Sequence, residues 1–143
     1  MKSSIFTTIP EIKDRSRADN KLAWAFLTNT PITPGHTLIA PKRVVTRYDE
    51  LTEAELLAIF ELTTVVRERL IQTFGAEGFN YAWNEGAHYG QSAPHFHLHI
   101  VPRTPKDEGI TNTNLAKFLY RPGSREATPE TELRVIVTKL RHP

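Results

Sequence analysis

The chain has 143 residues and a mass of 16.3 kDa, with 39% hydrophobic and 24% charged residues, which is the profile of one globular domain. The lack of cysteine excludes disulfides, thiolate nucleophiles, Cys-ligated zinc and iron–sulfur clusters. A net charge of +2 is too small for a nucleic-acid coat protein, and no stretch approaches the roughly 20 apolar residues of a membrane span. We therefore expect one cytoplasmic domain over residues 1–143, with no signal peptide and neither a membrane nor a nucleic acid as partner.

The first structured segment is expected to be a β-hairpin over residues 15–29. Asp19-Asn20 is a turn candidate, and the apolar run over 22–27 that follows it indicates a strand with both faces covered. A connection rich in proline and glycine then leads to a short strand over 36–40. The chain is thus predicted to open with neighbouring short strands.

The strongest helix signal begins at Thr52. The segment Thr52-Glu53-Ala54-Glu55 has the spacing of a capping box, and Gly75 is a suitable C-terminal stop. Between these two points apolar residues recur at helical intervals, among them Leu56, Ile59, Phe60, Val66 and Leu70. We interpret this apolar stripe as a face packed on a sheet rather than as a groove for a partner.

The second half of the chain is expected to add two strands and a second helix. Residues 79–85 have the pattern of a strand, and residues 95–102 have that of another with strict alternation. The pattern then weakens, and we expect irregular structure up to Thr128-Pro129-Glu130, which has the N-cap, early proline and acidic first turn of a helix start. Strands mixed with one long helix and one C-terminal helix indicate an α+β fold with a mainly antiparallel sheet.

The most informative segment is His95-Phe96-His97-Leu98-His99-Ile100-Val101-Pro102. Alternate residues of a strand share a face, so His95, His97 and His99 are expected on one side and apolar residues on the other. We expect the apolar face to pack in the core and the histidine face to carry the reacting groups. Burial and mutual repulsion would lower the pKa of these imidazoles and favour the neutral, nucleophilic ring.

Two kinds of chemistry fit three alternating histidines. In one, the three imidazoles chelate a divalent metal and leave one position open for catalysis. In the other, one imidazole is a covalent nucleophile toward phosphorus or an acyl carbon, and its neighbours hold the tautomer and stabilise the developing negative charge. A nucleotide-binding module without catalysis is a third alternative.

The loop before the histidines favours the phosphorus chemistry. Asn84, Gln91 and Ser92 supply amide and hydroxyl groups, and the glycines at 86 and 90 let backbone N–H groups approach an anion closely. A phosphate cradle needs such donors, whereas a zinc site does not. His36 is a fourth imidazole that can join the cluster if its strand lies beside that of the other three.

These residues resemble the histidine triad (HIT) family, whose signature is His-φ-His-φ-His-φ-φ with φ apolar. All seven positions of the signature match at residues 95–101. Residues 84–86 and 90–103, together with the upstream segment 31–42, are also similar to this family. The resemblance covers about residues 18–104, whereas residues 105–143 have no motif that assigns them.

The resemblance implies a nucleotide-binding α+β domain, usually a homodimer, that attacks the α-phosphorus of nucleoside phosphate esters, anhydrides or phosphoramidates. In this family the central histidine, here His97, is the nucleophile, and it forms a transient nucleotidyl-histidine that water hydrolyses. His99 would contact the scissile phosphate and the leaving group, and His95 and His36 would be supporting hydrogen-bond partners. No metal or cofactor is built into such a site, although a polyphosphate substrate can arrive with Mg²⁺.

The same resemblance implies substrate contacts outside the histidines. Asn84, Gln91 and Ser92 correspond to phosphate-binding residues of the family. Where many relatives place an Asp or Asn against the ribose hydroxyls, this chain has Thr28 with Asn29 beside it. Threonine is the weaker partner for two hydroxyls, so either Asn29 substitutes for it or the sugar is held less tightly.

The branch of the family stays open. Pro102-Arg103 resembles the dinucleoside polyphosphate hydrolases, whereas residues 84–86 and 90–92 are more similar to the nucleoside phosphoramidases. Diadenosine polyphosphates and adenosine phosphoramidates are therefore both candidate substrates. Trp24 and Phe26 are interpreted as core residues rather than as walls of a base pocket.

Overall fold

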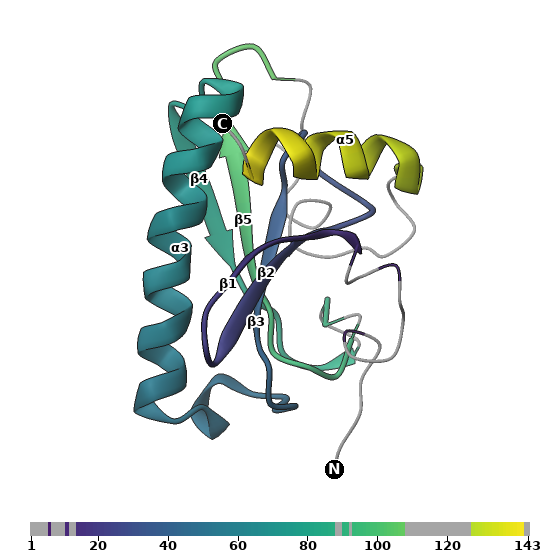
Figure 1. Ribbon diagram of the computed structural model, residues 1–143. Coiled ribbons are helices and arrows are strands. Elements are labelled where there is room, and N and C mark those ends of the chain that lie inside the picture. Colours follow the sequence, from purple (N-terminus) through teal and green to yellow (C-terminus); the bar gives the residue numbers. More distant parts are fainter. Residues whose placement is uncertain are drawn as a thin grey trace.

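The structure is a computed structural model and describes residues 6, 11, 14–87, 90–91, 93–107 and 127–141. Its five strands form one sheet in the order β1-β2-β3-β5-β4, in which all neighbours are antiparallel (Figure 1). The strands are β1 (Ser16–Asp19), β2 (Ala23–Leu27), β3 (Thr37–Pro41), β4 (Gly78–Ala82) and β5 (Leu98–Arg103). The helices are the 3-10 turn η1 (Tyr48–Glu50), α3 (Glu53–Phe74) and α5 (Glu130–Arg141). The predicted α+β fold is confirmed.

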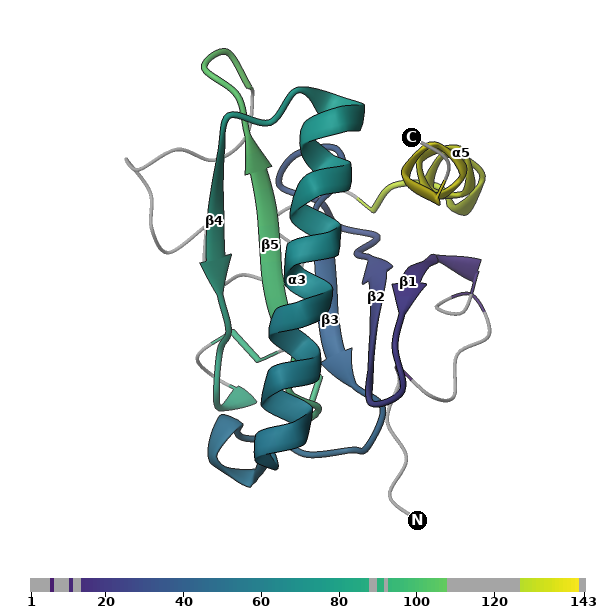
Figure 2. The ribbon, with the colours of Figure 1, turned by 60° about the vertical axis from the view of Figure 1, so that its left-hand side comes forward.

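Both long helices cover the same face of the sheet. Helix α3 packs along β2, β3 and β5, and α5 packs beside it against β1 (Figure 2). The main core lies between these two layers and includes Leu27, Ile39 and Ile100 from the sheet. In the part of the chain that the structure describes, no helix is both long and apolar enough to cross a membrane.

The expected hairpin is formed by β1 and β2, and Asn20 closes it. The side-chain oxygen of Asn20 accepts hydrogen bonds from the N–H groups of Leu22 and Ala23, at 3.1 and 2.9 Å. Its amide nitrogen donates to the main-chain oxygen of Ala58 at 2.8 Å, which ties the turn to α3. One side chain therefore fixes both the local turn and its position against the helix layer.

Helix α3 begins and ends where the sequence predicts. Thr52 Oγ1 accepts from the N–H of Glu55 at 3.1 Å, and the carboxylate of Glu55 accepts from the N–H of Thr52 at 2.9 Å. Gly75 ends the helix in the left-handed conformation, with φ of 65°. The second helix also follows the expected start after Thr128 and buries Leu133, Val137 and Leu140. Of the irregular segment expected after residue 102, residues 108–126 lie outside the described part.

Two strand boundaries differ from the prediction. Strand β4 ends at Ala82 rather than at residue 85, and β5 begins at Leu98 rather than at residue 95. The pairing of β5 with β3 extends from Thr37 opposite Ile100 to Ile39 opposite Leu98, although β3 itself continues to Pro41. The preceding Phe96 N–H bonds the main-chain oxygen of Val45 instead. His95 and His97 therefore precede the strand, and only His99 lies within it.

The opposite face of the sheet carries a smaller apolar cluster. It consists of Phe6, Phe26, Leu38, Ala40 and Ala93, with Trp24 partly buried against it. This face was expected to be purely chemical, but side chains cover part of it and His95 is completely buried. The core interpretation of Trp24 and Phe26 agrees with their packing, because their ring centroids lie 4.4 Å apart within this cluster.

Candidate active site

Three of the four candidate histidines, His36, His97 and His99, meet where β3 and β5 run side by side. Leu38 of β3 pairs with His99 of β5, which brings His36, just before β3, next to His99. The rings of His97 and His99 lie 5.0 Å apart between centroids, and those of His36 and His99 lie 5.2 Å apart. Residues separated by about 60 positions in the sequence thus form one cluster.

The hydrogen bonds of His36 define its tautomer. The N–H of Ile32 lies 3.1 Å from His36 Nδ1 and can only donate, so Nδ1 is the acceptor. A neutral His36 then carries its hydrogen on Nε2, which lies 3.0 Å from His99 Nδ1. His36 therefore donates to His99, and His99 keeps its own ring hydrogen on Nε2.

One hydrogen bond of His97 determines which of its ring nitrogens keeps a lone pair. Its Nδ1 lies 2.7 Å from the main-chain oxygen of His95, and because a carbonyl oxygen can only accept, Nδ1 carries the hydrogen. The lone pair is consequently on Nε2. Burial lowers the pKa of His97, although its bond to the His95 carbonyl partly opposes this, so the ring stays neutral at lower pH than an exposed histidine.

His95 anchors the segment that precedes β5. The side chain is fully buried, and its Nε2 donates to the main-chain oxygen of Pro41 at 2.8 Å. Burial lowers the pKa of His95, against the opposing effect of hydrogen bonds to the backbone of Pro41 and Arg43. The imidazole ties the turn before β5 to the end of β3, while its carbonyl holds the ring of His97.

The metal-chelate alternative requires three ligating side chains around one point. Among the residues that the structure describes, no group of three or more His, Asp or Glu side chains is placed to hold a metal ion. All three signature histidines belong to that part, and two of them have a ring nitrogen bonded to a main-chain oxygen, at Pro41 and at His95. The imidazoles of His97 and His99 lie side by side, whereas the ring of His95 is bonded to Pro41.

Phe6 belongs to the site although nothing in the sequence analysis indicated it. Its ring centroid lies 5.1 Å from that of His97 in an edge-on arrangement and 5.3 Å from that of His95. It also packs on Phe26 at 5.0 Å. Phe6 is 5% exposed and contributes to the burial that lowers the pKa of His97. The only signal available in the sequence was an aromatic residue beside Ile5 in a short N-terminal segment.

The loop residues expected at the phosphate hold the loop itself together. Gln91 Oε1 accepts from the N–H of Gly86, and Gln91 Nε2 donates to the main-chain oxygen of Thr46, both at 2.9 Å. Asn84 Nδ2 donates to the main-chain oxygen of Gly90 at 3.4 Å. The two glycines have φ of 93° and 103°, a region that disfavours any side chain. Ser92 lies outside the described residues.

The two candidate ribose residues lie in the connection before His36. Thr28 Oγ1 accepts from the N–H of Thr30 at 3.2 Å, and the N–H of Thr28 donates to the main-chain oxygen of His36 at 3.3 Å. The main-chain oxygen of Asn29 accepts from the N–H of Thr128 at 2.6 Å. The segment that begins the C-terminal helix is thus joined to the candidate ribose loop.

Three buried histidines and a half-buried fourth, His99, on an antiparallel α+β sheet define a histidine triad domain. The HIT domain family model matches residues 10–106, and the chain belongs to this family. A match at 39% identity is the asymmetrical bis(5'-nucleosyl)-tetraphosphatase of Schizosaccharomyces pombe, over 61% of this chain and 48% of that protein.

Two further relatives extend over more of the chain. An AP-4-A phosphorylase of Mycobacterium tuberculosis is 34% identical over 87% of this chain and 62% of its own length. A Hit-like protein from Bartonella henselae has the same fold, with a TM-score of 0.76 and 23% identity over 97% of this chain and 94% of its own. The chain spans about half to two-thirds of the length of the curated relatives named here.

Proposed function

We propose that this protein is a nucleotidyl hydrolase or transferase that attacks the α-phosphorus of a dinucleoside polyphosphate or a nucleoside phosphoramidate through His97. The observation that carries the proposal is the 2.7 Å bond from His97 Nδ1 to the His95 carbonyl, which leaves the Nε2 lone pair on a neutral ring. A neutral imidazole is a competent nucleophile toward phosphorus. We place the reaction in the cytoplasm.

The reaction proceeds in two displacements. In the first, His97 Nε2 forms a bond to the α-phosphorus as the bond to the leaving group breaks, giving a nucleotidyl-histidine. The leaving group departs with the electron pair of the broken bond, and it accepts a hydrogen bond from His99, whose ring hydrogen lies on Nε2 because His36 donates to its Nδ1. In the second, water attacks the phosphorus, the bond to His97 breaks and its electron pair returns to Nε2, and one proton of the water goes to solvent. The neutral His97 and a nucleoside monophosphate are released.

The residues around the histidines are proposed to bind the substrate and to hold it in position. Asn84, Gln91 and Ser92 are proposed to lie around the substrate phosphate. The hydrogen bonds of Gln91 to the backbone indicate that it acts by shaping the loop around Gly86. Thr28 and Asn29 are proposed for the ribose. Any Mg²⁺ would arrive with the polyphosphate as part of the substrate.

The names of the relatives support dinucleoside polyphosphates as the substrate class. The similarity to a bis(5'-nucleosyl)-tetraphosphatase and to an AP-4-A phosphorylase favours diadenosine tetraphosphate as the first compound to test. Adenosine phosphoramidate is the comparison, because residues 84–86 and 90–92 resemble the phosphoramidase branch.

The test measures AMP release from both compounds by wild type, His97→Asn and His97→Gly. We expect wild type to release AMP and both variants to lose at least about 1,000-fold in rate. Free imidazole should restore part of the activity of His97→Gly, since the missing side chain leaves a space of its shape. Full activity in His97→Asn would refute the nucleophile assignment.

Parallel samples separate metal from covalent chemistry. EDTA should slow only the polyphosphate reaction, and added Mg²⁺ should restore it, because the ion is part of that substrate. Acid quenching during turnover should trap a nucleotidyl group on wild type, and intact-mass analysis should find none on His97→Asn. If both compounds are bound but neither is cleaved, the protein is a binding module.

We also propose a homodimer that forms at the β4 edge. Strand β4 ends the sheet order, and Tyr81 and the neighbouring Trp83 are each 46% exposed although both are large and apolar. An exposed edge strand with aromatic side chains is a natural surface for a second copy. Light scattering should give twice 16.3 kDa for wild type and a lower mass for Trp83→Glu; a wild-type monomer would contradict the proposal.

A further inference from the structure

Arg17 is a charged side chain buried on the helix side of the sheet. It extends from β1, is 2% exposed, and donates from Nη1 to Thr37 Oγ1 at 2.9 Å. Within the described part of the chain its Nε and Nη2 atoms are buried and have no hydrogen-bond partner. Buried N–H donors without an acceptor are rare in proteins, and a guanidinium cannot avoid them by losing its charge at neutral pH.

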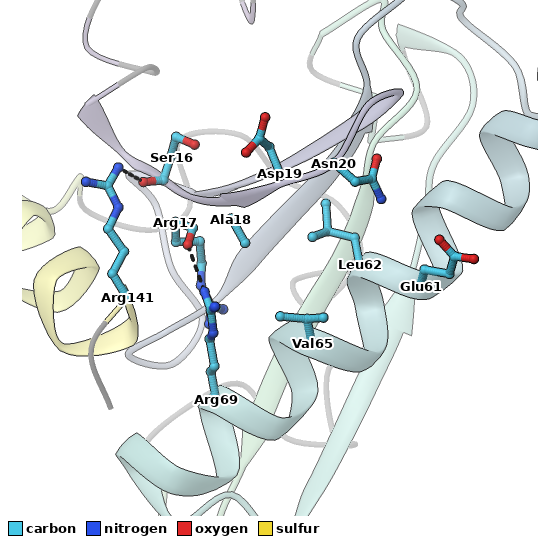
Figure 3. A pocket seen from close by; sticks show the side chains of 10 residues that line it. All are labelled: Ser16, Arg17, Ala18, Asp19, Asn20, Glu61, Leu62, Val65, Arg69 and Arg141. Atoms are coloured by element: carbon cyan, nitrogen blue, oxygen red, sulfur yellow. Dashed lines mark hydrogen bonds between the residues drawn. The ribbon is translucent and has the colours of Figure 1, made fainter.

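Two more arginines line the same cavity between β1, α3 and α5 (Figure 3). Arg69 of α3 donates from Nη1 to the main-chain oxygen of Arg17 at 3.1 Å, and Arg141, the last residue of α5, donates to the main-chain oxygen of Ser16. These carbonyl oxygens position the two guanidinium groups and use one N–H of each. The remaining donors of a guanidinium fork are those that bind oxyanions in pairs.

The charge of this arginine cluster, Arg17, Arg69 and Arg141, is not balanced. None of its members forms an ion pair with a carboxylate of the described residues. The cavity also contains Asp19, which is paired with Lys42 at 3.1 Å, and Glu61. Burial and the neighbouring charge of Arg69 lower the pKa of Arg17 to about 9, so the group remains cationic at pH 7.

We propose that the arginine cluster binds the phosphate group of a small phosphorylated compound or inorganic phosphate. A phosphate dianion supplies both the missing negative charge and several acceptor oxygens for buried N–H donors. The site is separate from the histidines, because it opens between the sheet and the helices, whereas the histidines belong to the segments around the opposite apolar cluster. It is therefore distinct from the proposed catalytic position of a substrate phosphate.

The test measures binding of inorganic phosphate and of AMP by calorimetry at constant ionic strength, with chloride as the reference anion. The His97→Asn variant is used, so that no substrate is turned over and the result does not depend on the proposed function. We expect saturable phosphate binding, with amide NMR shifts at residues 16–19 and 69. The AMP arm shows whether the site also accepts an esterified phosphate.

Matched variants locate the site. Arg69→Gln in the same background should weaken phosphate binding at least about tenfold, as expected for the loss of a charge-assisted hydrogen bond. The control is Arg67→Gln on the same helix, because Arg67 lies outside the cavity and pairs with Glu68. It should leave binding unchanged. Arg141→Gln gives a second variant that removes a cavity arginine without touching the buried core.

Three results would overturn the proposal. One is the absence of saturable phosphate binding. Another is an equal loss in Arg69→Gln and Arg67→Gln, which would mean that only general charge matters. The third is binding whose NMR shifts are confined to His99 and its neighbours, which would place the anion at the catalytic histidines instead.

Discussion

His36 Nε2 lies 3.0 Å from His99 Nδ1, although the two residues are 63 positions apart in the chain. The contact exists because β3 and β5 are neighbours and Leu38 pairs with His99. It links the Pro- and Gly-rich connection before β3 to the histidine that contacts the leaving group in the proposed reaction. The proton position on His99 is therefore controlled from a different segment.

Replacing His36 tests this control. His36→Ala should lower kcat about five- to tenfold, the equivalent of about 1–1.4 kcal/mol for one buried hydrogen bond, with little change in KM. His36→Gln keeps a donor and should lose less. Nitrogen NMR of His99 should show the hydrogen moving from Nε2 toward Nδ1 in His36→Ala; an unchanged tautomer would contradict the assignment.

The pH dependence follows from the direction of the His97 shift. Because burial lowers the pKa of His97 in the folded state, the neutral nucleophile persists below pH 6.5, and activity should fall only at lower pH. The unfolded chain takes up the proton first, so stability is complete above pH 6.5 and decreases as the pH falls through the folded pKa.

Urea unfolding between pH 5 and 8 measures the second effect. The slope due to His97 is at most about 1.4 kcal/mol per pH unit. His97→Gln cannot titrate, and its free energy of unfolding should decrease less steeply below pH 6.5 than that of wild type. Identical slopes for the two proteins would show that His97 is not responsible.

Phe6 offers a test of the apolar cover over His97. Phe6→Ala should admit water beside His97, raise the pKa of His97 toward its ordinary value, and move the acidic limb of the pH–rate profile to higher pH. The loss of stability should not exceed the about 3–5 kcal/mol typical of Phe→Ala in a core. Phe6→Leu retains an apolar side chain and should shift the profile less. An unmoved acidic limb in Phe6→Ala would argue against the role of the ring.

Gly35 and Gly75 form a matched pair for stability. Both have positive φ, 92° and 65°, but an added Cβ at Gly35 would lie 2.8 Å from Leu70 Cδ2 and 2.9 Å from Phe74 Cε2, whereas at Gly75 it would meet nothing within 4 Å. Gly75→Ala should cost about 1–2 kcal/mol from backbone strain alone. Gly35→Ala should cost about 2–4 kcal/mol, because steric overlap adds to the strain. Denaturant unfolding compares them, and equal losses would show that the overlap relaxes freely.

Local signals in the sequence predicted much of this fold. The capping box of Thr52 and Glu55 and the stop at Gly75 bounded α3 because helix ends are determined by residues within one turn. The alternation of the triad indicated neighbouring imidazoles, and His36 was expected to join them only if its strand lay beside theirs, which the pairing of β3 with β5 provides. The direction of the pKa shifts at His95 and His97 also agrees with the expectation.

Features that depend on distant partners could not be predicted. The start of β5 follows from the end of its pairing with β3 at Leu98 and from the bond of Phe96 to Val45, and no residue type near His95 indicates either. The placement of Phe6 over His97 depends on packing against Phe26. Gln91 has the composition of a phosphate ligand, and only the fold shows that its amide bonds the loop and Thr46.

The orientation of His97 has a consequence for how such a site changes over evolutionary time. The acceptor of its Nδ1 hydrogen is the main-chain oxygen of His95, a group that every residue type provides. A substitution at position 95 can loosen the turn, but it cannot delete that oxygen. The orientation of the nucleophile is therefore inherited with the path of the backbone, and selection can vary the surrounding side chains without losing it.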